Sequence, residues 1–263
     1  MEYREVNGAA LRYEVTGSGP RAVVLVHEMG ATLESWDEVA PALARDRRVL
    51  RFDTRGAGLS EKIRGAADID VVADDIAALL DAVGIVGKVA LAGGAVGAAI
   101  CLRFALRHPG RISAVVAMAP AIGLTPERRA ATIERAAAIE THGMRPLAAN
   151  GLDASWPPVM RGDVARFEAF RARWLGNDPA SLAAIFRMLV ALDMERDLAR
   201  LACPVLVLAG RYDQVRPPAV VEPVARAIPG ARYDILDTAH FMPAQAPALV
   251  AAAIRGFLES VGA

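Results

Sequence analysis

The chain has 263 residues, of which 54% are apolar, and its mean hydropathy is +0.30. Basic and acidic residues number 30 each, so no cationic excess points to nucleic acid or to an anionic membrane surface as a partner. No apolar run approaches the ~20 residues of a membrane span, and the first residues lack the form of a signal peptide. We therefore expect a cytoplasmic enzyme built as one large domain, with or without an inserted cap.

The N-terminal residues predict an antiparallel hairpin. Apolar and polar residues alternate over 3–6 and 11–15, and Asn7-Gly8 between them is a strong turn signal. The β-branched run over 22–26 then predicts a buried parallel strand.

From there to about residue 120, predicted strands and helices alternate, which indicates a parallel sheet covered on both faces. The stretch 122–201 breaks the pattern because it is helical throughout, with no strand-like run. We expect it to form a cap over the carboxyl ends of the strands, and the core to comprise 1–121 and 202–263. The other predicted strands are 48–52, 89–92, 113–118, 204–209 and 233–236. The predicted helices outside the cap are 35–44, 69–83, 98–108, 217–227 and 246–260.

The organising segment is V-A-L-A-G-G-A-V-G, residues 89–97. It predicts a short strand, a tight glycine turn and the start of a helix, which is the context of the nucleophile elbow G-x-S-x-G. The flanking glycines permit a strained central residue and a close passage of the helix. The central residue is Ala95, and a methyl group cannot attack a carbonyl.

Five motifs occur in the order of one known fold family: V-H-E-M-G, F-D-T-R-G-A-G-L-S, the elbow, L-A-G-R-Y-D and D-T-A-H-F. On these motifs the chain resembles the α/β-hydrolase superfamily over nearly its whole length. V-L-R-F-D-T-R-G-A-G and the layout of the cap are most similar to 3-oxoadipate enol-lactonases. The resemblance implies an α/β fold with a mostly parallel, doubly wound sheet, an N-terminal antiparallel hairpin and an inserted helical cap.

The resemblance also implies a set of catalytic positions, ordered as nucleophile, acid and histidine. They fall on Ala95, Asp213 and His240. His240 would be the general base, and Asp213 would fix its tautomer, with Asp237 a weaker rival for that role.

The backbone N–H of Val96 and that of Met29 or Glu28 would form an oxyanion hole. Glu28 itself departs from the family, which usually has glycine there. Its side chain either points to solvent or pairs with an arginine such as Arg55, or it supplies a second acid/base group to the pocket. Asp53 and Arg55 match a loop that is mostly structural.

Several cap residues are candidates for substrate contacts. Trp156 could line the pocket, and an arginine could bind a substrate carboxylate in a bidentate manner; the candidates are Arg128, Arg129, Arg145 and Arg161. The expected substrate is a small molecule carrying a carboxylate. No metal-spaced His/Cys cluster and no G-x-G-x-x-G occur, so neither a metal nor another cofactor is expected. We interpret Cys101 and Cys203 as core residues of a protein whose cysteines are reduced. The sequence does not indicate the oligomeric state.

Three explanations of Ala95 compete. The chain could be an ordinary serine esterase or lactonase with an engineered alanine at the nucleophile. It could be a natural hydrolase that uses Asp213 and His240 without a serine, on a lactone, ester, enamide or β-diketone. It could also be a non-catalytic binding module. The intact acid–histidine pair argues against the binding module, and Glu28 favours the serine-free enzyme, because a chain altered only at Ala95 would not depart from the family at a second position.

Overall fold

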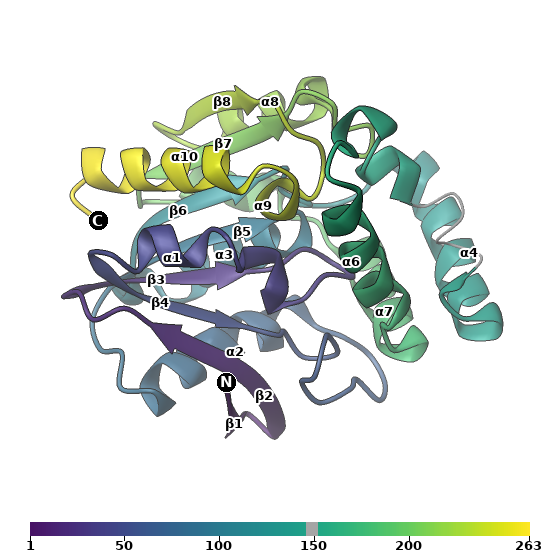
Figure 1. Ribbon diagram of the computed structural model, residues 1–263, viewed down its shortest axis with the longest axis horizontal. Coiled ribbons are helices and arrows are strands. Elements are labelled where there is room, and N and C mark those ends of the chain that lie inside the picture. The colour runs from purple at the N-terminus through teal and green to yellow at the C-terminus, as the bar shows by residue number, and fades with distance from the viewer. Residues whose placement is uncertain (146–151) are drawn as a thin grey trace.

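A computed structural model, which describes residues 1–145 and 152–263, contains an eight-stranded sheet in the order β1-β2-β4-β3-β5-β6-β7-β8 (Figure 1). β1 and β2 are antiparallel to their neighbours, and β4, β3 and β5 to β8 are parallel. The predicted hairpin and mostly parallel sheet are thus confirmed. The strands are β1 (Glu2–Val6), β2 (Ala9–Thr16), β3 (Arg21–Val26), β4 (Arg47–Phe52), β5 (Val89–Gly94), β6 (Ile112–Met118), β7 (Val205–Gly210) and β8 (Arg232–Leu236).

Helices cover both faces of the sheet. α1 and α10 lie on one face, and α2 and α3 pack together on the other (Figure 1). The apolar faces of these helices and the continuous apolar runs of the central strands form the main core. The helices are α1 (Ala40–Leu43), α2 (Ile69–Ala82), α3 (Val96–Arg107), α8 (Pro218–Ala227), α9 (Met242–Gln245) and α10 (Pro247–Ser260).

One predicted helix differs from the structure. The apolar spacing over 35–44 predicts a single helix, but the structure has the 3₁₀-helix η1 (Leu33–Trp36) followed by the one-turn helix α1. Pro41 lies in the first turn of α1, where its missing N–H is tolerated. A proline inside one continuous helix would remove a hydrogen bond, so the chain starts a new helix there.

Helices between β6 and β7 lie together beyond the carboxyl ends of the strands (Figure 1). These cap helices are α4 (Pro126–His142), α6 (Val164–Leu175) and α7 (Pro179–Ala191), accompanied by the 3₁₀-helices η3 (Pro158–Met160) and η4 (Glu195–Arg200). The chain leaves and re-enters the core at neighbouring points, because Gly123 and Asp193 form a β-bridge. Residues 146–151 of the predicted helical stretch lie outside the described residues.

No helix in 1–145 or 152–263 has the length and apolar character that crossing a membrane would require.

The elbow depends on close backbone packing between α3 and β3. A Cβ placed on Gly97 would lie 2.5 Å from the carbonyl oxygen of Val26 and even closer to that of His27. Only glycine therefore allows the first turn of α3 to approach the end of β3 this closely. This contact sets the position of residue 95 relative to the loop after β3.

We expect Gly97→Ala to lower the free energy of unfolding by about 1–3 kcal/mol, because backbone atoms must move to admit the methyl group. Urea unfolding followed by circular dichroism measures this difference. Gly256→Ala is the matched control, since Gly256 lies in α10 with open space around it. That change should raise stability by roughly 0.5–1 kcal/mol through helix propensity. Equal stability of the two variants would contradict the packing argument.

Candidate active site

Ala95 occupies the turn between β5 and α3, with φ 48° and ψ −110°. Its N–H donates to the carbonyl of Met118 at 2.8 Å, and its own carbonyl accepts from Ala99 and Ala121. A positive φ is costly for any residue with a Cβ. The structure thus holds a strained elbow whose side chain, a methyl group, faces a cavity.

The predicted acid and histidine meet at this elbow. Asp213 follows β7, His240 follows β8, and Asp213 Oδ2 lies 2.8 Å from His240 Nδ1. Both side chains are buried, and Asp213 Oδ1 accepts from the N–H groups of Val215 and Arg216 at 2.8 and 2.9 Å. A carboxylate held in this way assigns the imidazole proton to Nδ1 and leaves Nε2 as the acceptor. The rival Asp237 is exposed and pairs with Arg211.

The loop that carries His240 is fixed from the cap side. The backbone N–H of His240 donates to the carbonyl oxygen of Ser155 at 3.1 Å. The side-chain amide of Gln245 donates to the same oxygen at 2.9 Å. The side-chain carbonyl oxygen of Gln245 accepts from the backbone N–H of Ala239. Gln245 therefore positions the histidine loop, and nothing in the sequence pattern distinguishes it from an ordinary helix residue.

Two backbone N–H groups are available to bind an oxyanion beside Ala95. Val96 starts α3, where N–H groups have no intrahelical acceptor. Within the described residues, neither its N–H nor that of Met29 has a hydrogen-bond acceptor. Both residues line the same cavity as Ala95 and His240, whereas Glu28 does not, which favours Met29 over Glu28 as the second donor.

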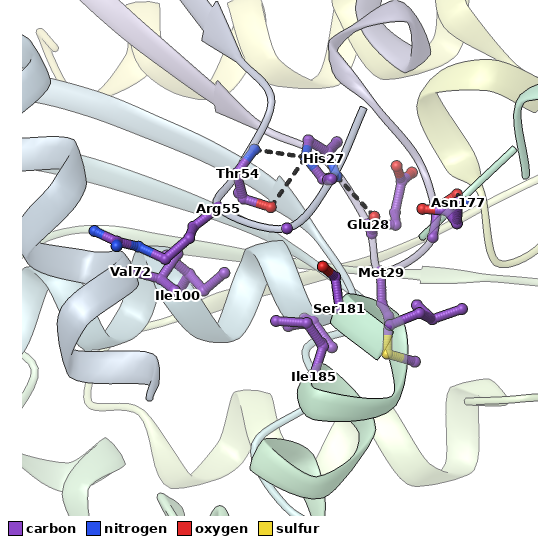
Figure 2. Close-up of a pocket in the computed structure, with 15 residues that line it drawn as sticks. His27, Glu28, Met29, Thr54, Arg55, Val72, Ile100, Asn177, Ser181 and Ile185 are labelled. Atoms are coloured by element: carbon purple, nitrogen blue, oxygen red, sulfur yellow. Dashed lines mark hydrogen bonds between the residues drawn. The ribbon is translucent and has the colours of Figure 1, made fainter. Parts of the chain in front are cut away.

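His27 holds the turn that carries Met29 (Figure 2). Its Nδ1 lies 2.8 Å from the carbonyl oxygen of Glu28, and its Nε2 accepts from the N–H of Thr54 at 3.0 Å. Burial lowers the pKa of His27, so the ring stays neutral in this pair of contacts. These two hydrogen bonds of His27 fix the peptide group between Glu28 and Met29 and hence the direction of the Met29 N–H.

Glu28 is buried, which corrects the expectation that its side chain points to solvent or pairs with Arg55. It is 1% exposed, and Arg55 pairs instead with Asp75 at 2.8 Å. Neither carboxyl oxygen has a hydrogen-bond partner among the described residues. Burial raises the pKa of Glu28 to about 7, although the neighbouring His240 and Ser35 act in the opposite direction.

The Glu28 side chain fills space that Gly94, which has no side chain, leaves empty in the elbow. A Cβ on Gly94 would lie 2.5 Å from Glu28 Cγ. Glycine at position 94 and glutamate at position 28 are therefore matched to each other.

A cavity of about 250 Å³ lies between the elbow and the cap helices. A smaller one of about 30 Å³, shown in Figure 2, adjoins it and shares Met29, Val96 and Leu182 with it. The larger cavity combines apolar walls with several polar groups, as small-molecule sites do. Its lining is Met29, Ala95, Val96, Ala121, Leu124, Arg128, Thr132, Arg135, Ala154, Ser155, Trp174, Leu182, Phe186, Leu189, Gln214, Val215, Arg216, His240 and Phe241.

The aromatic candidate of the cap lies behind this cavity. Trp156 is 1% exposed, its Nε1 donates to the carbonyl of Met160, and its ring packs against Phe167 and Phe170. It is not among the lining side chains of the larger cavity, whereas Phe241 is.

The four arginine candidates of the cap have different surroundings. Arg128 lines the larger cavity. Arg129 lines a neighbouring groove that shares Leu124 and Arg216 with the larger cavity. Arg161 pairs with Asp153, and Arg145 is exposed. Two lining arginines, Arg135 and Arg216, are not among the sequence candidates.

The loop after β4 is structural, as expected for Asp53 and Arg55. Asp53 accepts from the N–H groups of Leu33 and Leu59, both at 2.8 Å, and pairs with Arg12 at 3.0 Å. The Asp53 carboxylate thus ties three segments together and makes no contact with the cavity lining.

Residues 95, 213 and 240 follow β5, β7 and β8 in the chain order of α/β-hydrolases, and with this sheet they define the α/β-hydrolase fold. The chain belongs to the family Hydrolase_4, described as serine aminopeptidase, S33, whose model matches residues 18–241. It is therefore a member of a hydrolase family, as the resemblance in sequence implies.

Known relatives agree with this assignment. The chain is 27% identical to a putative carbamate hydrolase RutD of Caulobacter sp. (strain K31), over 99% of this chain and 97% of the relative. A thermophilic esterase from Thermogutta terrifontis (29% identity) and the enol-lactonase from Burkholderia xenovorans LB400 (28%) both superpose with a TM-score of 0.91. These alignments cover 98% of this chain and 97% and 100% of the two structures.

One relative matches only in part. The dihydrolipoyllysine-residue acetyltransferase component of the acetoin cleaving system of Pseudomonas putida is 39% identical over 118 residues. That alignment spans 44% of this chain and 32% of the relative.

The buried Glu28 carboxyl predicts a pH-dependent stability. Between pH 4.5 and about 7 the folded chain keeps this proton while the unfolded chain releases it. The free energy of unfolding therefore falls as the pH rises through this window. Glu28→Gln removes the effect, so it should match the parent chain near pH 4.5 and exceed it by on the order of 3 kcal/mol above pH 7.

Urea unfolding of both proteins from pH 4.5 to 8.5 measures this difference. Glu5→Gln changes an exposed glutamate and serves as the control. A difference between Glu28→Gln and the parent that stays constant over this range would show that the carboxyl is not buried as described.

Proposed function

We propose that the protein is a hydrolase that acts on a small activated carbonyl compound without a serine nucleophile. Lactones, esters, carbamates, enamides and β-diketones have the required chemistry, and the first three are the bonds that the relatives' names indicate. The observation that carries the proposal is the 2.8 Å contact between Asp213 and His240 at a cavity where the nucleophile position is a methyl group. A pure binding module has little use for that pair.

In this proposal, water takes the part of serine. Neutral His240 accepts a proton from water at Nε2, and the resulting hydroxide attacks the substrate carbonyl carbon. The N–H groups of Val96 and Met29 bind the oxyanion that forms. Collapse of the tetrahedral intermediate breaks the bond to the leaving group, which takes the proton back from His240. The loss of a triad nucleophile can cost ~10⁶ in rate, so the substrate must carry a good leaving group.

Glu28 is the second acid/base group of the proposal. It is buried next to the elbow, and a pKa of about 7 allows it to be protonated or ionised at working pH. Its electrostatic coupling to His240 and the shared walls of the two cavities support a role in holding or relaying the proton of the attacking water.

A serine hydrolase with an altered nucleophile is the second candidate. The strained backbone of Ala95 favours it, because this conformation normally serves to present a reactive side chain. The contact between Glu28 and Gly94 favours the serine-free enzyme, because the departure from the family pattern then extends beyond Ala95.

The free thiols of Cys101 and Cys203 are consistent with a reducing compartment, and we infer a cytoplasmic location.

A turnover panel separates these functions. The parent chain, Ala95→Ser and His240→Ala are assayed on p-nitrophenyl acetate, an enol ester and a small lactone. We expect the parent to turn over an activated substrate and His240→Ala to lose at least about a hundredfold in kcat/KM. An inert parent together with an active Ala95→Ser would establish the altered serine hydrolase. Ligand binding without turnover in any variant would point to a binding module.

Glu28→Gln tests the second acid/base group. The amide keeps the size of the side chain but cannot transfer the proton, so kcat should fall roughly 10²-fold while KM stays near that of the parent. A full pH–rate profile of both proteins measures the effect. Glu5→Gln makes the same change at an exposed glutamate and is the control. Unchanged kcat in Glu28→Gln would reduce Glu28 to a packing residue.

A further inference from the structure

The cap side of the larger cavity is lined by cations. Arg128, Thr132 and Arg135 occur at positions i, i+4 and i+7 of α4, so they share one face of that helix. Arg216 enters the same lining from the turn after β7. Asp and Glu are absent from the described residues of this lining.

These three arginines lack the partners that arginines usually have. Arg128 and Arg135 are exposed and Arg216 is buried, and none of the three forms an ion pair with a described carboxylate. Arg128 donates to the carbonyl of Val215 at 3.2 Å, and Arg216 donates to that of Gly123 at 3.0 Å. Most of their guanidinium N–H groups therefore remain available to a ligand.

Arg216 is the most informative of the three. It is only 6% exposed, and burial together with the nearby Arg128 lowers its pKa to about 10, while Asp213 opposes the change. A buried cation without an ion-pair partner is unfavourable, and an anion in the cavity would remove that cost. The backbone N–H of the same residue holds Asp213, so Arg216 links the catalytic acid to this end of the cavity.

We propose that Arg128, Arg135 and Arg216 bind an oxyanionic group of the substrate, a carboxylate or a phosphate, at the opposite end of the molecule from the carbonyl that reacts beside Ala95. The inference rests on the proposed function for the location of the reacting carbonyl. It goes beyond that function by restricting the substrate to small anions, and it assigns specificity to Arg135 and Arg216. Guanidinium groups suit both oxyanions, because their planar N–H fork matches two oxygens at once.

Calorimetric titration of the full chain tests the site without any turnover. The probes are glutarate, inorganic phosphate and glutaramide, the neutral counterpart of glutarate. We expect an anion to bind and glutaramide to bind at least tenfold more weakly. Tighter binding of glutarate identifies a carboxylated substrate, and tighter binding of phosphate identifies a phosphorylated one. Equal affinities for glutarate and glutaramide, or no anion binding, would overturn the inference.

Matched variants locate the site. Arg128→Gln and Arg135→Gln should each weaken binding of the preferred anion roughly ten- to a hundredfold, which is typical of one charge-assisted contact. Arg129→Gln removes the same charge from the same helix, and Arg129 is not among the residues that line the larger cavity, so this change should leave the affinity unchanged. Equal losses in Arg128→Gln and Arg129→Gln would show a general charge effect and reject the site.

Arg216 requires a variant that protects the fold. Arg216→Lys keeps the positive charge and the backbone N–H to Asp213 but loses the planar fork, and it should weaken anion binding about tenfold. Its thermal unfolding is compared with that of the parent to confirm folding. If the protein binds anions through these arginines but shows no turnover that depends on His240, the anion site is supported and the proposed chemistry is rejected. If it shows turnover but binds no anion, the proposed chemistry is supported and the anion site is rejected.

Discussion

The close approach of α3 to the end of β3 is the constraint on which the rest of the site depends. Gly97 permits this approach, and Ala95 closes the turn with a positive φ. The turn presents the N–H of Val96 to the cavity, and the loop after β3, pinned by His27, presents that of Met29. In the proposed function these two backbone N–H groups bind the oxyanion, and neither depends on the identity of the side chain at position 95.

Glu28 is the feature least expected in such a site. A buried carboxyl without hydrogen bonds is unfavourable, because desolvation penalises its charged form and its neutral form lacks partners. Gly94 leaves free the space that this side chain occupies. Groups of this kind cluster at functional sites, where a pKa near the working pH is useful. A purely structural role would be served better by an apolar residue of the same size.

The sequence predicts most of the fold and the central site because their signals are local or ordered. Alternating strands and helices, the Asn7-Gly8 turn and the glycines around Ala95 each depend on nearby residues. Asp213 and His240 are predicted from the ordered motifs of the family resemblance, and the structure places their side chains 2.8 Å apart. What the sequence does not reveal depends on long-range packing. Gln245 reaches the carbonyl of Ser155, 90 positions away, and burial rather than spacing distinguishes Arg216 from other arginines.

The same distinction explains the cap. Periodicity indicates that α4 is a helix, but it cannot select the face that meets the cavity, because α4 has few buried residues and charges on most sides. The cavity lining, rather than the periodicity, distinguishes Arg128 and Arg135, which contribute to it, from Arg129, which does not. The cavity then has His240 and the elbow at one end and the arginines of α4 and Arg216 in the rest of its lining. An anionic substrate would be oriented by this arrangement before any chemistry begins. In the proposed function such orientation matters because no covalent bond holds the substrate, so attack by water depends on how the carbonyl is positioned.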